Sequence, residues 1–568
     1  MHLLQRIPVT SSGGEEAIGL YAHRDADGTS FDTYFGAFAS SYWREISTVK
    51  TVVLSATLGG SGTAELVALA DGSETVLHSL TVAQGEIQFP PVNIDSDDSD
   101  ALFLRVGGCE LVTASWSTVD LPARDVHLSA VITTFNRPEY VGRIVEKFDV
   151  LATSIEAVRS SFRLSVIDNA RNLKLSATRS LEVEVIPNPN LGGAGGFARG
   201  LIHARNGGWA THVLFMDDDI AVEPESLVRT LALLRYAKDP MCCVHGAMIS
   251  EDQPWLCVEA GADYLWESIY PPRPLHHLED LRDRNVALAK KLDRPYAYSA
   301  WWYTAFPLAL TKDNPLPVFI RGDDVAWGLM HTRGHIQTLP GIGVWHADFD
   351  VKNVPAAVYY EIRNITLASL LTEPGYRWWH FEKRFLGYAF LNLFSMRYLS
   401  TEYLLRGMND FFAGPERLMS TDHAALHGDL YSRDEEKSAK LDAELAGVEM
   451  DAKSTGPTSA KEFLLSLLTL GGSIVPAPLR KRSLVAVPVQ KRAIAMSIRH
   501  NTIVHRHPRQ PLGFVARRDD KRFWLLLAQV AVMATKIPFR YGVTARKYKK
   551  KYPEMVGQEA WEKSFSRI

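Results

Sequence analysis

The feature that most constrains the fold is a series of short apolar runs that alternate with helical segments between residues 125 and 370. The runs occupy 127–135, 164–168, 183–186 and 213–216, and a helical stretch at 141–158 separates the first from the second. Strands that alternate with helices predict an α/β unit with a largely parallel sheet. Polar residues follow the runs, and ligands of such sheets bind beyond the carboxyl ends of the strands. We therefore expect a binding site at that edge.

Consecutive carboxylates, Asp217, Asp218 and Asp219, follow the run at 213–216. Alternation along an extended chain places Asp217 and Asp219 on one side and Asp218 on the other, so that Asp217 and Asp219 converge where a hard divalent cation can bridge them. The alternative is a simple turn, because Asp is common where strands end. The motif alone leaves the metal site and the turn evenly balanced.

A Gly-rich loop at 188–200 precedes a helical segment and contains Gly192 and Gly193. Glycines allow a diphosphate to approach backbone amides, and the N-terminus of the following helix favours anions. By itself the loop is a weak signal. It lacks the Lys-Ser/Thr ending of a P-loop, and it follows the third strand, whereas a dinucleotide-binding fingerprint follows the first.

The chain divides into regions of different texture. Residues 1–122 combine short alternating runs with regular turn residues, which predicts an N-terminal β-sandwich that is jelly-roll-like. Its aromatic stretch at 33–38 suits either core packing or stacking on sugars, and packing is favoured. Residues 123–370 form the α/β unit, and residues 371–568 read as a C-terminal helical domain with a basic tail at 546–551. The expected fold class is thus multidomain α/β.

Composition narrows the function classes. A chain of 568 residues exceeds the roughly 250–300 residues of a single core. With 62 basic and 65 acidic residues, the net charge of -3 gives no electrostatic case for a nucleic-acid partner. The cysteines lack zinc-type spacing, so we expect them to be reduced. The N-terminus lacks a signal peptide's apolar core, and the apolar stretches 463–470 and 523–534 are shorter than the ~20 residues of a membrane span. We expect a cytoplasmic protein without a transmembrane segment.

Taken together, several motifs resemble those of a known family. The segments 133–138 (TTFNRP), 167–170 (IDNA), 190–196 (NLGGAGG) and 216–219 (MDDD) resemble, in order and spacing, the nucleotide-sugar half of inverting glycosyltransferases of family 2 with the GT-A fold. The resemblance implies that 123–370 is a GT-A catalytic domain. It also implies that the acidic cluster holds a divalent metal, Mn²⁺ or Mg²⁺, on the donor diphosphate.

Segments in the second half of this region resemble a more specific family. The segments 299–307, 319–325, 343–346 and 359–364 look like those of the polymerising galactofuranosyltransferases of mycobacterial (actinobacterial) arabinogalactan biosynthesis. The resemblance implies UDP-galactofuranose as donor, a lipid-linked galactan as acceptor, a homo-oligomer (a tetramer), and a peripheral location on the inner face of the plasma membrane. The chain departs from the family pattern at Gly322, where a Trp is expected before the aspartate pair, and this position bears on acceptor register.

The same resemblance assigns roles to individual residues. The metal ligands are Asp217, Asp219 and His346, a donor set that suits Mn²⁺. Asp324 is the catalytic base, with Asp323 beside it. The acceptor-binding residues are Glu259, Trp301 and Trp302, whose aromatic faces suit sugar rings. The donor-binding residues are Phe135, Arg137, Asp168, Asn190, Gly192, Gly193, Asp217 and Asp218.

The expected function is inverting, metal-dependent transfer of galactofuranose to a galactan. The alternatives are a family-2 transferase that uses another donor, such as dTDP-rhamnose, and a carbohydrate-binding protein built on the N-terminal sandwich. For the membrane, the basic tail from Arg546 to Lys551, together with Trp524, is the expected contact with an anionic surface. A solvated helical face is the alternative for that tail.

Overall fold

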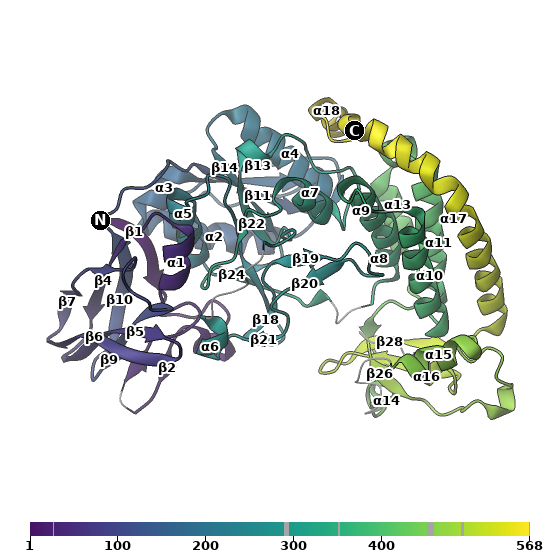
Figure 1. The fold of residues 1–568 in the computed structure, drawn as a ribbon, viewed down its shortest axis with the longest axis horizontal. Coiled ribbons are helices and arrows are strands. Elements are labelled where there is room, and N and C mark those ends of the chain that lie inside the picture. The colour runs from purple at the N-terminus through teal and green to yellow at the C-terminus, as the bar shows by residue number, and fades with distance from the viewer. Residues whose placement is uncertain (27, 289–294, 350–352, 451–458, 490–493, 567–568) are drawn as a thin grey trace.

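The computed structural model describes the whole chain except residues 27, 289–294, 350–352, 451–458, 490–493 and 567–568. In Figure 1 the N-terminal strands lie on the left, the α/β sheet in the centre, and long helices with a small sheet on the right. The site described below lies in the central part.

The N-terminal region folds into two antiparallel sheets. One has the order β1-β10-β4-β7, with β8 on β4, and the other has the order β2-β3-β9-β5-β6. Leu54 of one sheet and Leu104 of the other belong to one hydrophobic cluster, together with Trp116. The elements are β1 (His2–Ile7), η1 (Glu15–Leu20), β2 (His23–Arg24), β3 (Thr29–Ser30), α1 (Ser40–Ile46), β4 (Thr51–Leu58), β5 (Gly62–Ala70), β6 (Ser73–Val82), β7 (Gly85–Gln88), β8 (Val92–Asn93), β9 (Ala101–Gly107) and β10 (Leu111–Thr118).

The central sheet has the order β13-β12-β11-β14-β22-β16-β23. Strands β13, β12, β11 and β14 are parallel, and β22 is antiparallel to β14, so the predicted largely parallel sheet is confirmed. The elements are β11 (Leu128–Thr134), α2 (Pro138–Ser154), α3 (Glu156–Ser161), β12 (Phe162–Asp168), β13 (Glu182–Pro187), α4 (Gly192–Gly207), β14 (His212–Asp217), α5 (Glu225–Tyr236), β16 (Cys243–His245), β22 (Tyr303–Pro307) and β23 (Ile336–Gln337).

A second, smaller sheet carries the histidine of the site. Its order is β15 (Ala221–Val222), β24 (Gly343–His346), β17 (Ala247–Ser250), β18 (Leu256–Glu259) and β21 (Glu279–Asp280). Aromatic residues of the N-terminal region support β24: the rings of Phe35 and Trp345 lie 5.6 Å apart, and the Tyr34 hydroxyl donates to the Ile342 carbonyl at 3.1 Å. Both Tyr34 and Phe35 are buried, as expected for packing residues. Nearby lie β19 (Ala262–Tyr264), β20 (Pro272–Pro274), α6 (Arg284–Ala287), η2 (Leu308–Leu310) and α7 (Asp323–His331).

The C-terminal region is helical but also contains a sheet of order β25-β28-β27-β26, which the purely helical prediction missed. The cause is visible in 485–489 and 502–506, where Val and Ile give high strand propensity. The elements are α8 (Pro355–Tyr360), the π-helix η4 (Glu361–Ile365), α9 (Thr366–Thr372), α10 (Trp378–Phe394), α11 (Tyr398–Ala413), α12 (Pro415–Ser420), α13 (His423–Tyr431), β25 (Ala439–Lys440), α14 (Ala443–Ala446), α15 (Ala460–Leu468), η6 (Ala477–Leu479), β26 (Ala486–Pro488), α16 (Ile494–Ser497), β27 (Thr502–Arg506), β28 (Leu512–Arg517), α17 (Asp520–Met555) and α18 (Gln558–Phe565).

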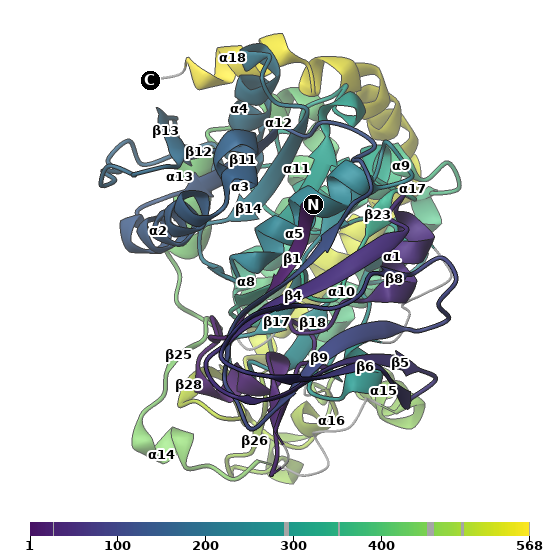
Figure 2. The same ribbon diagram turned by 90° about the vertical axis from the view of Figure 1, so that its left-hand side faces the viewer.

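Helix α17 runs along α10 and α11 from the small sheet to α18 (Figure 1). Trp524 and Arg546 lie on this one continuous helix, about 33 Å apart at 1.5 Å per residue, so they do not form the single cluster that the sequence predicted. By length and composition α17 qualifies as a membrane span among the described residues, with 28% of its most apolar window buried, although helices packed on soluble cores pass the same test. Figure 2 shows α18 returning beside α4, where Trp561 clusters with Ala198 and Ile202.

Candidate metal and nucleotide-sugar site

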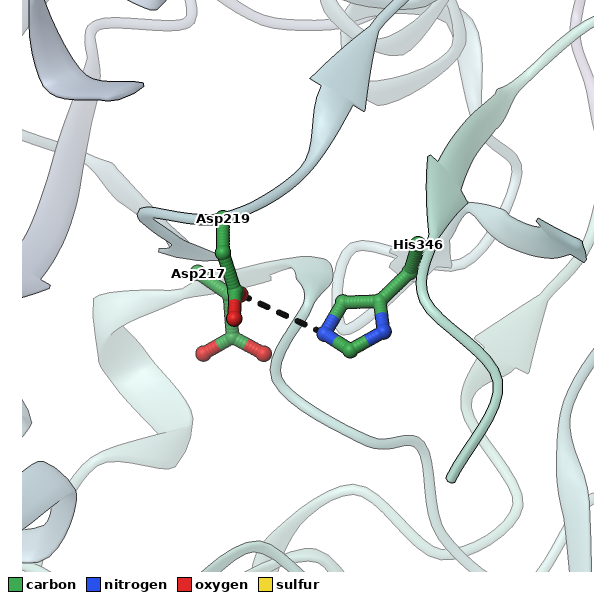
Figure 3. A group of neighbouring side chains, drawn as sticks. All are labelled: Asp217, Asp219 and His346. Carbon is green, nitrogen blue, oxygen red and sulfur yellow. Dashed lines mark ion pairs between the residues drawn. The ribbon is translucent and has the colours of Figure 1, made fainter. Parts of the chain in front are cut away.

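Two strand ends bring together the carboxylates and the imidazole predicted to bind metal. Asp217 ends β14, Asp219 follows two residues later, and His346 ends β24 in the other sheet. One ligand atom of each lies within 4.8 Å of the others, and His346 Nε2 is 3.3 Å from Asp219 Oδ1. Figure 3 shows these side chains pointing toward one another from separate strands. The geometry fits a divalent cation, since Mn²⁺ accepts both imidazole and carboxylate ligands.

The two carboxylates differ in electrostatic state. Burial and the neighbouring charge of Asp219 raise the pKa of Asp217. Burial also opposes ionisation of Asp219, but the His346 hydrogen bond and the charges of His346 and Arg137 outweigh it and lower the pKa of Asp219. Burial disfavours a charged His346, yet Asp219 raises the pKa of that imidazole to about 9. In the apoprotein, therefore, Asp219 and His346 form an ion pair beside a carboxyl that resists ionisation.

Arg137 neutralises the remaining side of the cluster. It follows β11 as the N-cap residue of α2, and its Nη1 donates to Asp218 Oδ1 at 2.8 Å and to Asp219 Oδ2 at 2.7 Å. Asp218 is 5% exposed and turned toward Arg137, as alternation along the strand requires. The predicted contact of Arg137 with a nucleotide stays a prediction, and the structure gives the residue a second role in holding these carboxylates.

The predicted donor side lies at the same edge of the sheet. In the parallel register Thr134 pairs with Asp168, and Thr133 pairs with Asp217. The Asp168 carboxylate accepts from the backbone amides of Ala170 and Leu173 at 2.9 and 2.7 Å, so it shapes its own turn. Phe135, which follows the first strand, exposes 49% of its surface and is available for a ligand.

The Gly-rich loop opens helix α4, as predicted. Gly192 has φ = 70°, and a Cβ there would lie 2.3 Å from the Phe319 carbonyl oxygen, so glycine is required. Asn190 Oδ1 accepts from the Gly192 amide at 3.2 Å. A Cβ on Gly193 would lie 3.6 Å from Asp323 Oδ2, which places the loop beside the predicted catalytic pair. The predicted donor residues of the loop thus border the predicted catalytic pair.

The aspartate pair begins helix α7. Asp323 is buried, and burial followed by the charge of Asp324 raises its pKa. Burial also raises the pKa of Asp324, to about 6, although backbone amides such as that of Val325, 2.8 Å from Oδ1, favour its charged form. A carboxyl that ionises near neutral pH is suited to general-base work. Because Asp324 is also the more exposed member of the pair, it is the better candidate for that role.

Glu259 lies on the acceptor side, at the end of β18. Burial, and then the charge of Asp324, raise its pKa to about 8. Its Oε1 is buried and has no hydrogen-bond partner among the described residues. An orphaned carboxyl oxygen close to the candidate base is suited to a hydroxyl-bearing ligand, because an unpaired buried polar atom is costly.

The predicted acceptor platform, Trp301 and Trp302, is mostly interior. They are 4% and 5% exposed, and the Trp301 indole packs edge-on against Phe197 and Phe215. Trp302 Nε1 donates to the Gly246 carbonyl at 2.9 Å, and the Trp302 carbonyl accepts from the Asp217 amide at 3.3 Å. Both tryptophans therefore contact β14, the strand that ends at Asp217. Their role in acceptor binding stays a prediction.

Phe349 is an exposed aromatic residue that the sequence reasoning missed. Its ring is 4.7 Å from that of His346 and 6.3 Å from that of Trp302, and 52% of its surface is exposed. Its only sequence signal is its position three residues after His346. Arg363 and Asn364, which belong to a motif already singled out, are further residues whose role emerges only from their contacts, described below.

Comparisons with known proteins show which proteins the chain is similar to. A family described as Galactofuranosyltransferase 2 N-terminal matches residues 21–113. The Galactofuranosyltransferase GlfT2 of Mycolicibacterium smegmatis is 27% identical over 552 residues, covering 88% of this chain and 78% of the relative. The GlfT2 of Mycobacterium tuberculosis is 26% identical, covering 89% of this chain and 81% of the relative.

Solved structures with distant similarity include GalNAc-T7 with UDP, GalNAc and Mn²⁺, with a TM-score of 0.28, 14% identity and coverage of 41% of this chain and 45% of that chain. They also include the mannosyltransferase PcManGT of Pyrobaculum calidifontis with GDP-Man and Mn²⁺, with a TM-score of 0.28, 14% identity and coverage of 54% and 80%. TM-scores at this level do not establish a shared overall fold. The sequence relatives, which span most of the chain, identify it as a glycosyltransferase homologous to the mycobacterial galactofuranosyltransferases GlfT2.

Proposed function

We propose that the protein is an inverting, metal-dependent transferase that moves galactofuranose from UDP-galactofuranose to a lipid-linked galactan. The observation that carries the proposal is the convergence of Asp217, Asp219 and His346 beside the Asp323–Asp324 pair, in a chain similar to GlfT2. This arrangement supports a site that holds a diphosphate on one side and a base on the other.

The donor is held by charge and by backbone. A divalent cation, Mn²⁺ or Mg²⁺, when bound by the two carboxylates and the imidazole, would neutralise the diphosphate and assist its departure. Gly193, at the start of α4, lies beside Asp323, and a helix N-terminus favours anions. Phe135 supplies an exposed aromatic face for the uracil base. Arg137 keeps Asp218 and Asp219 in place while the donor binds.

The transfer step is a single displacement. Asp324 takes the proton from an acceptor hydroxyl as that oxygen forms a bond to the anomeric carbon. The bond from the anomeric carbon to the diphosphate oxygen breaks, and UDP leaves with the electron pair. Attack opposite the leaving group inverts the anomeric configuration. Glu259, whose Oε1 lacks a partner among the described residues, orients the acceptor by accepting from a neighbouring hydroxyl.

The lipid-linked acceptor places the protein on the inner face of the plasma membrane, as a peripheral homo-oligomer, a tetramer by its resemblance to the family. The residues that best support this location are exposed apolar side chains on α15, in the segment 474–479 and at the start of α17, which we call the apolar surface. Its exposed members are Phe463, Leu464, Leu465, Leu468, Ile474, Leu479, Trp524 and Leu525. Arg480 links the segment 474–479 to the start of α17 through a 2.8 Å contact with Asp520, and Lys481, Arg482 and Lys521 are exposed near it. Apolar residues bordered by cations suit an anionic lipid surface.

A donor panel tests the proposal. Purified protein with Mn²⁺ and a synthetic galactofuranosyl disaccharide should transfer sugar from UDP-galactofuranose and not from UDP-galactopyranose or dTDP-rhamnose. Chelation of the metal should stop the transfer. Faster transfer from dTDP-rhamnose would replace the donor with the alternative named from the sequence. Absence of transfer from all three nucleotides would overturn the proposal.

A further inference from the structure

The backbone that leads to the catalytic pair adopts conformations that side chains rarely take. Phe319 has φ = 77°, Arg321 has φ = 61°, and Gly322 has φ = 83°. Glycine tolerates such values, but Phe and Arg are outliers there. Strain of this kind persists only where the surrounding structure holds it, and it concentrates at functional sites. The two aspartates that follow Gly322 are the predicted catalytic pair, so whatever holds this turn also places them.

The turn is held by a buried pair of side chains on the π-helix η4. Asn364 Nδ2 donates to the Ile320 carbonyl at 2.9 Å and to the Arg321 carbonyl at 2.8 Å. Arg363 Nη2 donates to the Val318 carbonyl at 2.8 Å. Asn364 and Arg363 are 1% and 3% exposed. The backbone carbonyls of the strained segment 318–321 are therefore held from one side by these two side chains. The π-helix that carries them is a rare element, and such elements recur at functional sites.

The pair is itself fixed in orientation. Arg363 Nε donates to Asn364 Oδ1 at 2.8 Å, so the amide presents its nitrogen to the turn. Arg363 Nη1 donates to the Tyr359 hydroxyl at 2.8 Å, and that hydroxyl donates to Asp410 on α11 at 2.6 Å. The chain of contacts thus ties the turn to the packed helices of the C-terminal region.

The opposite side of the turn contacts the Gly-rich loop. The Phe319 carbonyl accepts from the Ala194 amide at 3.0 Å, and this contact depends on the positive φ of Phe319 and on the missing side chain at Gly192. The strained turn therefore lies between the buried pair on η4 and the loop that faces the diphosphate. Both halves of the site take their relative position from it.

We propose that Asn364 and Arg363 are positioning residues, which we call the π-clamp, and that the clamp holds Asp323 and Asp324 against the Gly-rich loop. Without the two hydrogen bonds from the Asn364 side chain, the turn relaxes toward ordinary φ values. The aspartates at the start of α7 then move away from the donor. The inference rests on the proposed role of Asp324 for its kinetic readout, whereas its structural readout is independent of any substrate.

The test compares Asn364→Ala and Asn364→Asp with Asn392→Ala. Asn392 is a control for burial alone: it is equally buried, at 1% exposed, and lies on α10, but its side-chain amide has no hydrogen-bond partner among the described residues. We expect kcat to fall by about 10²-fold in both Asn364 variants, as for a 1 Å misplacement of catalytic groups, while the KM for donor changes less than threefold. Asn364→Ala should melt lower than Asn392→Ala, because it alone loses side-chain hydrogen bonds, but both variants should be folded at the assay temperature. A kcat in Asn364→Ala equal to that of the control overturns the proposal.

Amide hydrogen exchange provides the second readout, which needs no active enzyme. Peptides covering 192–197 and 319–326 should exchange faster in Asn364→Ala than in wild type, and not in Asn392→Ala. Unchanged exchange in these peptides would overturn the proposed π-clamp. This result does not depend on which nucleotide-sugar is the donor. If Asn364→Ala does not fold, Asn364→Ser, whose single hydroxyl cannot serve both carbonyls, is measured and interpreted in the same way.

Discussion

His346 Nε2 lies 3.3 Å from Asp219 Oδ1, although 127 positions separate the two residues in the chain. The pair shows how the apoprotein tolerates its run of aspartates: the imidazole and Arg137 together balance Asp218 and Asp219. For Asp217, burial and the charge of Asp219 outweigh the opposing charge of His346, so its pKa is raised. This difference makes the two candidate metal ligands distinguishable by experiment.

Asp217→Asn and Asp219→Asn should shift the stability of the metal-free protein in opposite directions. Burial and repulsion raise the pKa of Asp217, so its ionisation costs stability as pH rises above the unfolded value, and Asn removes that cost. The lowered pKa of Asp219 contributes stability that is present above about pH 4 and is lost as pH falls toward 2. At pH 8 with chelator, the free energy of unfolding should be higher in Asp217→Asn and lower in Asp219→Asn than in wild type, each by roughly 1 kcal/mol or less.

The same two variants should both lose metal-dependent binding of UDP. Each removes one carboxylate of the candidate site, so titration calorimetry with Mn²⁺ should show affinity no better than that without metal. Glu251→Gln is a suitable control, because Glu251 lies near His346 but outside the cluster. Wild-type affinity in Asp219→Asn would remove that residue from the site.

Transfer should depend on the ionisation of Asp324. Its raised pKa of about 6 means that the active, charged base forms as pH rises from 5 to 7, so kcat should rise over that range. Asp324→Asn should lower kcat by about 10²-fold or more and leave the affinity for UDP unchanged. A larger loss in Asp323→Asn, with near-normal rates in Asp324→Asn, would assign the base to the preceding residue.

Phe349 should contribute to acceptor binding. Its half-exposed ring beside His346 and Trp302 is the kind of face on which a sugar stacks, so Phe349→Ala should raise the KM for acceptor by roughly 3- to 10-fold, equivalent to about 1 kcal/mol. Donor affinity should not change. Phe539→Ala is the control, because Phe539 is 83% exposed on the distant helix α17. Equal acceptor KM values for the two variants would exclude the stacking role.

Membrane attachment should depend on α15 more than on the basic tail. Leu464→Glu combined with Leu468→Glu places charges among the exposed apolar side chains of α15, and should release the protein from anionic vesicles in a sedimentation assay. Lys549→Gln combined with Lys550→Gln changes only the tail, and should weaken binding modestly and mainly at low salt. The reverse result would return the anchor to the tail, where the sequence placed it.

Much of the site was predictable because its signals are local. The strand run before Asp217 and the alternation of side chains placed Asp217 and Asp219 together on one side, and the parallel sheet placed Asp168 at the same edge. The Gly-rich loop was recognisable from its composition, but the structure gives its own reason for Gly192, where a Cβ would lie 2.3 Å from the Phe319 carbonyl oxygen. His346 and Asp324 came from resemblance to a family, since nothing in their own segments distinguishes them from structural residues.

The remaining features depend on contacts between segments that are far apart in the chain. The order of strands and helices in the central α/β unit, the acidic cluster and the Gly-rich loop could be predicted from the sequence, because each follows from the periodicity and chemistry of a few neighbouring residues. Only the tertiary structure decided that Trp301 and Trp302 are interior, that Trp524 lies far from the basic tail, and that a sheet interrupts the C-terminal helices. The tertiary structure also sets the opposite pKa shifts of Asp217 and Asp219, and it brings Asn364 within hydrogen-bond distance of the turn before Asp323. Burial and charge pairing set these properties, and both arise only when distant segments pack together.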